Sequence, residues 1–179
     1  MKTWRAAVSV VVMVSAGAAF AVGSDDTEPP APTPTSTDCP EGQVWDEETK
    51  ACLEADAKGL TDEDRYRALR ELAYAGRYDA ARIVLEAMPP ESDAVWTYRG
   101  FIARQEGHWL EALANYRHAL GLNPDNILAR SYLGQGLALR GETAAAERQL
   151  AEIRARGGSG TWAEAALVEA LTTGKSYNY

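Results

Sequence analysis

The sequence predicts an all-α fold in which three helical hairpins stack into an array and a seventh helix covers its end. The first observation is a repeat, because a glycine, an alanine and a large side chain recur three times in fixed order. The three copies are Gly76, Ala81, Leu85; Gly107, Ala112, Tyr116; and Gly141, Ala146, Leu150. The second is apolar spacing of about 3.6 residues, typical of amphipathic helices. The third is the glycine itself, which favours the left-handed conformation that ends a helix.

Residues 1–21 are predicted to be an export signal. Lys2 and Arg5 precede an uncharged run from 6 to 22, and Ala19-Phe20-Ala21 supplies the small residues read by signal peptidase. Cleavage is expected after Ala21, which would release the chain into the periplasm. The run is diluted by serine, glycine and alanine, and it is shorter than the ~20 predominantly apolar residues that a spanning helix needs. We therefore expect no stable membrane insertion after cleavage, and an uncleaved anchor is the alternative.

Residues 22–38 are predicted to be a disordered linker rich in proline and threonine. Five of the eight prolines fall between Pro29 and Pro40. From Ser24 to Asp38 no aliphatic side chain is larger than alanine. Burial of apolar surface therefore cannot offset the entropy lost on ordering.

Residues 39–60 are predicted to form a small hairpin and its connector to the helices. Short strands are expected around Val44-Trp45 and Lys50-Leu53, and Cys39 and Cys52 flank the polar turn between them. In an exported chain, two thiols without companions suited to a metal favour a disulfide. Closing so short a loop adds ~3 kcal/mol to stability in the chain-entropy model. We expect this effect to be local, because the repeats bury a core of their own.

The order Cys39, Gly42, Trp45, Cys52 resembles the first part of peritrophin-type chitin-binding modules. The resemblance extends from Cys39 to Cys52 alone and includes two of the six cysteines of those modules. The segment is also similar to the short Cys-flanked segment ahead of helical repeats in some exported alphaproteobacterial proteins. Two interpretations stay open for Trp45: a glycan contact, or an exposed side chain on a covalently closed loop.

The middle copy of the repeat carries Trp96-x2-Arg99-Gly100-x2-Ala103, then Ala112-x3-Tyr116, Ala119 and Pro124. This pattern resembles the tetratricopeptide repeat (TPR), whose period of about 34 residues is close to the spacing of the three copies. The repeat domain is expected to span residues 61–173, with 174–179 as a tail. The predicted helix pairs are 62–75 with 78–88, 93–106 with 109–121, and 126–140 with 143–156, followed by a capping helix over 162–173.

Local signals support these helix boundaries. Thr61 to Asp64 and Thr161 to Glu164 resemble capping boxes, which mark the start of a helix. The first two copies of the repeat are closer together than the second and third. Pro89-Pro90 is predicted to end the second helix about one turn early, which accounts for this shorter first spacing.

The TPR resemblance implies that an inner groove, lined by the first helix of each pair, holds a partner. The groove residues would be Tyr66, Arg70, Tyr74, Thr97, Phe101, Arg104, Ser131 and Gln135. Arg70 and Arg104 could bind a carboxylate, so an acidic or C-terminal peptide is one conceivable partner. The alternative is that these arginines pair with neighbouring glutamates. Phe101 and Arg104, three positions apart on one helix, are the predicted anchors of the groove, outside the helix-to-helix packing.

Composition excludes several function classes. The formal net charge of −8 provides no basic surface for nucleic acid. The two histidines, His108 and His118, and two cysteines do not supply a metal site, and no cofactor is expected. No nucleophile stands beside a base, so the chain is not expected to be an enzyme.

The first functional interpretation is therefore a noncatalytic periplasmic TPR protein that mediates protein-protein or protein-peptide interaction in a Gram-negative envelope. The alternatives are an envelope glycan-binding protein that uses the Trp45 hairpin, or a subunit of a larger envelope assembly. The sequence leaves the partner and the oligomeric state open.

Overall fold

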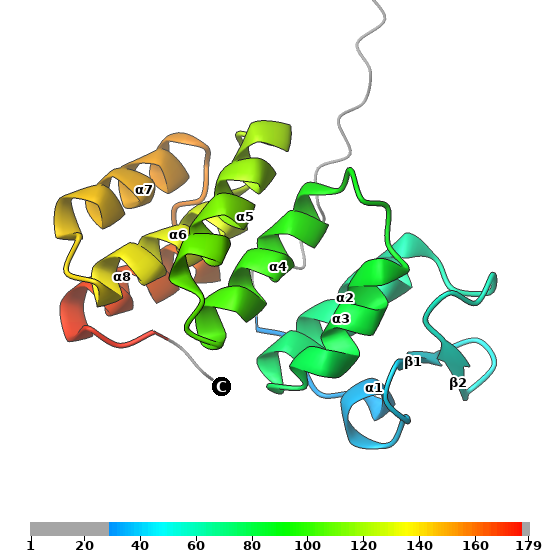
Figure 1. Cartoon of the computed structure of the whole chain (residues 1–179). Helices are drawn as coiled ribbons and strands as arrows, with labels where there is room; N and C mark the ends of the chain where they lie inside the picture. Colours follow the sequence, from blue (N-terminus) through cyan, green and yellow to red (C-terminus); the bar gives the residue numbers. More distant parts are fainter. Residues whose placement is uncertain (1–28, 177–179) are drawn as a thin grey trace, which may run out of the picture.

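The computed structural model describes residues 29–176, so the predicted signal peptide, 1–21, lies outside the described part of the chain. The elements in order are α1 (Pro34–Thr37), β1 (Gln43–Asp46), β2 (Ala51–Glu54), α2 (Asp62–Tyr74), α3 (Tyr78–Glu86), α4 (Asp93–Gln105), α5 (Trp109–Leu122), α6 (Ile127–Leu139), α7 (Thr143–Ala155) and α8 (Trp162–Thr173) (Figure 1). Between residues 29 and 176 no helix is both long and apolar enough to cross a bilayer.

Helices α2 to α8 form an array compatible with a helical repeat. They pair as α2 with α3, α4 with α5, and α6 with α7, and α8 packs on the last pair (Figure 1). The first helices α2, α4, α6 and α8 contact one another in succession, and α3 and α5 each pack against the pair that follows. Every predicted helix boundary lies within two positions of the observed one.

The predicted turn and cap signals are confirmed. Gly76, Gly107 and Gly141 follow α2, α4 and α6 with φ of 73°, 83° and 76°, the left-handed conformation that favours glycine. Thr61 caps α2 in a reciprocal capping box with Asp64. Thr161 caps α8 by accepting from the Glu164 N–H, but the predicted box is not reciprocal, because the Glu164 carboxylate accepts from the Gly160 N–H.

Glycines inside the helices set how closely neighbouring helices approach. A Cβ on Gly100 of α4 would lie 2.6 Å from the ring of Tyr116, which is fully buried on α5. A Cβ on Gly134 of α6 would lie 2.6 Å from Leu167 of α8. Since real Cβ atoms do not approach this closely, both helix contacts require a residue without a side chain.

The N-terminal hairpin is part of the main core. Strands β1 and β2 are antiparallel, with Val44 opposite Leu53 and Trp45 opposite Cys52. The predicted disulfide between Cys39 and Cys52 is confirmed, with an S–S distance of 2.05 Å. The Val44 side chain is only 1% exposed and belongs to the same buried cluster as the apolar face of α2. The hairpin and α1 therefore cap the first end of the array (Figure 1).

The expectation of a disordered linker as far as residue 38 is wrong for residues 33–38. Glu71 of α2, only 6% exposed, accepts hydrogen bonds from the Thr33 N–H (2.6 Å), the Thr33 hydroxyl (2.6 Å) and the Ser36 N–H (3.0 Å). Arg77 donates to the carbonyls of Thr35 and Ser36. Charge-assisted hydrogen bonds thus stabilise a segment that has little apolar surface to bury.

A second arginine fixes the connector between the hairpin and α2. The Arg65 guanidinium donates from Nε to the Ala55 carbonyl (2.7 Å), from Nη1 to the Leu60 carbonyl (3.0 Å) and from Nη2 to the Ala57 carbonyl (2.9 Å). The connector is therefore held against the start of α2, because one α2 side chain donates hydrogen bonds to three connector carbonyls.

We predict that Gly100→Ala lowers the free energy of unfolding by ~1–3 kcal/mol, because the added methyl overpacks the contact with Tyr116. Gly121→Ala on α5 is the matched control. Nothing lies within 4 Å of a Cβ at Gly121, so this change should stabilise the chain by up to ~1 kcal/mol through helix propensity. Urea unfolding followed by circular dichroism measures both, and equal effects of the two changes would contradict the assigned packing.

We predict that the double change Cys39→Ser with Cys52→Ser lowers the melting midpoint of the whole array. The hairpin shares the core of α2, so the ~3 kcal/mol attributed to closing this loop should be lost from one cooperative transition. Differential scanning calorimetry of the variant and of the wild type tests this. An unchanged main transition would instead support the local effect expected from the sequence.

Candidate functional site

The inner face of the array is filled by aromatic side chains of the chain itself. We call Tyr66, Tyr74, Tyr98, Phe101, Tyr132 and Trp162 the inner aromatic cluster. Tyr74 of α2 stacks on Phe101 of α4 at 5.5 Å between ring centroids, and Phe101 lies 4.9 Å from Tyr132 of α6. Trp162 of α8 lies edge-on to both Tyr74 (5.7 Å) and Tyr132 (6.3 Å). The cluster therefore connects the first and last helices of the array.

All eight predicted groove residues lie on the first helices of the three pairs, but most of them are not accessible. Six are buried and Tyr74 and Arg104 are partly buried; the six are Tyr66, Arg70, Thr97, Phe101, Ser131 and Gln135. Ser131 donates to the Ala163 carbonyl at 2.6 Å, and Gln135 donates to Ser131 at 3.1 Å. An open groove lined by these eight residues is therefore a wrong expectation, because α8 and the aromatic rings occupy that side.

The two predicted anchor residues belong to the packing. Phe101 is only 3% exposed and contacts rings from three helices. The Arg104 guanidinium lies 5.5 Å from the Phe101 ring centroid and 6.0 Å from that of Tyr132. Arg70 likewise lies 5.8 Å from the Tyr66 ring. These arginines thus contact aromatic faces, which attract a cation, and do not line an exposed surface for an acidic peptide.

Burial changes the titration of two tyrosines in this core. Burial raises the pKa of Tyr116 to about 12, and the Arg104 guanidinium beside the hydroxyl partly opposes this shift. Burial also raises the pKa of Tyr132 well above its ordinary value. Both hydroxyls therefore stay neutral in the folded chain at a pH where exposed tyrosines ionise.

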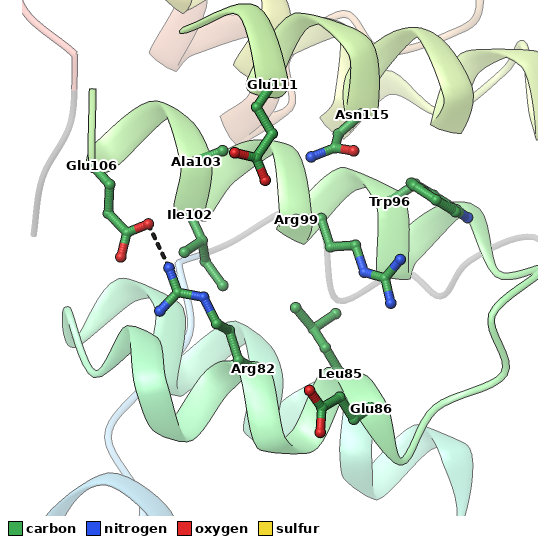
Figure 2. Close-up of a pocket in the computed structure, with 10 residues that line it drawn as sticks. All are labelled: Arg82, Leu85, Glu86, Trp96, Arg99, Ile102, Ala103, Glu106, Glu111 and Asn115. Carbon is green, nitrogen blue, oxygen red and sulfur yellow. Dashed lines mark hydrogen bonds and ion pairs between the residues drawn. The ribbon is translucent and has the colours of Figure 1, made fainter. Parts of the chain in front are cut away.

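A cleft on the opposite side of α4 is the best candidate site. This α3–α5 cleft has a volume of about 340 Å³ and is lined by Arg82, Leu85, Glu86, Trp96, Arg99, Ile102, Ala103, Glu106, Glu111 and Asn115 (Figure 2). Leu85, Ile102 and Ala103 form its apolar floor. The charged and amide groups come from α3, the middle of α4, the residue that follows α4, and α5. The volume lies within the ~300–1,000 Å³ typical of ligand pockets.

The cleft exists because α3 is short. Helix α3 has 9 residues, whereas α5 has 14 and α7 has 13. Pro89 and Pro90 follow α3 closely and prevent its extension. One missing turn leaves the α3 side of Trp96 and Arg99 uncovered, so part of the outer face of α4 stays open.

Most of the polar groups in the cleft already have partners. Arg82 forms ion pairs with Asp79 (2.8 Å) and with Glu106 at one end of the cleft (Figure 2). The Arg99 guanidinium lies 4.7 Å from the Trp96 ring centroid, and His118 covers Trp96 at 4.1 Å between ring centroids. The Trp96 indole N–H donates to the Pro90 carbonyl at 2.8 Å. These contacts define the rim of the cleft.

Sequence reasoning missed this cleft although it identified its cause. The early end of the helix before Pro89-Pro90 explains the shorter spacing between the first two copies. A helix one turn short in one repeat also implies an uncovered surface on the next helix. The aromatic and arginine at Trp96 and Arg99, three positions apart on α4, mark that surface.

The Trp45 hairpin offers a smaller hollow. It has a volume of about 100 Å³ between the hairpin, α1 and α2, with Trp45, Glu47, Asp64 and Arg67 among its lining residues. The Trp45 side chain is partly buried, and its indole N–H donates to Glu47 at 3.0 Å. Within residues 29–176 no three histidine, cysteine, aspartate or glutamate side chains are placed to share a metal ion.

We predict that Tyr116→Phe makes stability less dependent on alkaline pH. The unfolded-state pKa of tyrosine is ~10 and the folded-state pKa of Tyr116 is about 12. The stability from its neutral hydroxyl is thus complete below pH ~10 and is lost as pH rises through 12, an order of ~3 kcal/mol in full. No described group makes a well-aligned hydrogen bond to this hydroxyl, so the change should cost ~1 kcal/mol or less at pH 7. Urea unfolding of both chains at about pH 7 and about pH 11 measures the difference, and parallel losses would contradict it.

The helical array agrees with the repeat pattern in the sequence, and comparisons with known proteins give no independent support for a particular family. Searches with this chain matched no protein-family model, no curated protein and no solved structure.

Proposed function

We propose that the protein is a noncatalytic interaction module of the cell envelope, built from tetratricopeptide-type repeats, that binds a partner protein or peptide in the α3–α5 cleft. The observation that carries this proposal is the cleft itself, an apolar floor with a charged rim. Such a combination buries the apolar part of a ligand while polar groups orient it.

The arrangement of the middle repeat supports the tetratricopeptide assignment. Ala112, Tyr116 and Ala119 are fully buried on one face of α5. Gly100 lies where the family pattern has its close helix contact, and Tyr116 packs on it. Three such pairs and α8 also match the minimum of about three repeats that a stable array needs.

Export into an envelope compartment is supported by two features. The Cys39–Cys52 disulfide is compatible with an oxidising, exported compartment. The segment 1–21 has the pattern of a secretory signal. The periplasm is accordingly the proposed location.

One observation keeps glycan binding as a second candidate. Trp45 is only partly buried and lies beside Glu47, Asp64 and Arg67 in the smaller hollow. An aromatic face next to polar groups could contact a sugar ring. The small volume of that hollow, about 100 Å³ against about 340 Å³, favours the α3–α5 cleft as the main binding site.

We predict that Asn115→Trp abolishes partner capture. Asn115 is a partly exposed residue of α5 that points into the cleft (Figure 2), so an indole there would fill it without entering the core. Ala114→Trp is the matched control, because Ala114 is exposed on the same helix and does not line the cleft. The three chains are immobilised, exposed to envelope extract, and compared by quantitative mass spectrometry of the retained proteins.

The expected result is a set of proteins retained by the wild type and by Ala114→Trp but lost from Asn115→Trp. Sedimentation with peptidoglycan and chitin, using the wild type and Trp45→Ala, tests the second candidate in parallel. Co-sedimentation that requires Trp45, together with identical retention by all three immobilised chains, would replace the cleft proposal with glycan binding.

A further inference from the structure

We infer that the occupant of the α3–α5 cleft is a peptide segment that presents a basic side chain next to a bulky apolar one. This inference rests on the proposed function and specifies the chemistry of its partner.

The dimensions of the cleft favour a peptide over a compact small molecule. Along α4 its lining residues run from Trp96 through Arg99 and Ala103 to Glu106. A separation of ten positions corresponds to about 15 Å of helix at ~1.5 Å per residue. The ridges on either side are two helices, α3 and α5. A trough of this length can hold about four to five residues of extended chain at ~3.3 Å each.

The floor of the cleft selects apolar side chains. Leu85 and Ile102 are 3% and 2% exposed, so their side chains are packed firmly below the cleft. Trp96 is partly exposed and is fixed by its hydrogen bond to the Pro90 carbonyl. A ligand side chain that packs on the exposed part of Trp96 releases water from apolar surface, worth ~25 cal/mol for each Å² buried.

Carboxylates outnumber guanidinium groups in the lining of the cleft, where three glutamates accompany two arginines. The Arg82 guanidinium is shared between Asp79 and Glu106, and the Arg99 guanidinium lies over Trp96. Glu86 of α3 and Glu111 of α5 are both exposed. Glu86 forms no ion pair with any described residue, and Glu111 has only His108 as a described ion-pair partner, at 4.0 Å.

Glu86 and Glu111 lie on opposite sides of the cleft, on α3 and α5 (Figure 2). An ammonium or guanidinium on the ligand can pair with the carboxylate on either side. A charge-assisted hydrogen bond to either one is stronger than a neutral bond.

The net charge of the whole chain acts in the same direction. At −8 it attracts a basic segment over distances of about a Debye length, ~8 Å at physiological ionic strength. The cleft therefore combines long-range attraction for a cation with a short-range requirement for an apolar neighbour.

The test starts from a displayed library of randomised peptides. The wild-type chain is the selection target, and the Asn115→Trp chain is used to remove peptides that bind elsewhere. We expect the enriched peptides to carry lysine or arginine beside a leucine, isoleucine, phenylalanine or tryptophan. The most enriched peptide is then synthesised with a fluorescent label, and its Kd is measured by anisotropy against each chain.

The decisive variant is Glu86→Lys with Glu111→Lys, and its matched control is Glu48→Lys with Glu147→Lys. All four positions are exposed, and neither control residue lines the cleft. The two double variants have the same net charge, so any difference between them reports the local site. We expect the cleft variant to weaken binding by about tenfold or more, equal to ~1.4 kcal/mol, and the control to change it by less than about threefold. Circular dichroism verifies helix content in every chain.

Three other outcomes overturn the inference. Enriched peptides that are acidic or depend on a free carboxylate, and that bind the Glu86→Lys, Glu111→Lys chain more tightly, would assign the opposite ligand class while the cleft stays the binding site. Equal Kd values for the two double variants would show that local charge does not select the ligand. No enrichment over the Asn115→Trp chain would overturn both the inference and the proposed function.

Discussion

The close contact between α4 and α5 at Gly100 sets the geometry of the whole array. Because Gly100 has no side chain, the Tyr116 ring can lie directly against the α4 backbone and be completely buried. This places α4 and α5 as one unit, and the neighbouring pairs pack on either side of it. Both faces of the array follow from that unit: its inner side carries Phe101 and Arg104, and its outer side carries Trp96 and Arg99.

Helix positions were predictable from the sequence because their determinants are local. The left-handed glycines at 76, 107 and 141 end helices by their own conformational preference, and the Thr61 cap needs only the three residues that follow it. The docking of residues 33–38 was not predictable in this way. It depends on Glu71 and Arg77, which lie far along the chain, and the composition of the segment itself gives no sign of those partners.

The candidate site illustrates the same division. The sequence identified which residues share the inner face, since that follows from helical periodicity. It did not reveal that Trp162 reaches Tyr74 across the array and that aromatic rings fill the space between. Whether a concave face is open depends on side-chain volumes summed over four helices, a property of the assembled array. The outer cleft, by contrast, follows from a single deleted helical turn before Pro89. The shorter spacing between the first two copies of the repeat already indicates that deletion.

The three hydrogen bonds that the Glu71 carboxylate accepts from Thr33 and Ser36 form a clamp on the N-terminal segment. This clamp also determines how the molecule would carry mechanical load. Tension applied to the chain ahead of Thr33 would reach the folded domain first at the three hydrogen bonds on the Glu71 carboxylate. Behind them the Cys39–Cys52 bond closes the hairpin loop covalently, so the hairpin can extend little after the clamp fails. Force would then pass to α2 through Arg65 and the connector carbonyls. An array attached by its N-terminal segment would therefore receive tension through a short, stapled element that extends little, and the α3–α5 cleft lies beyond that element along the chain.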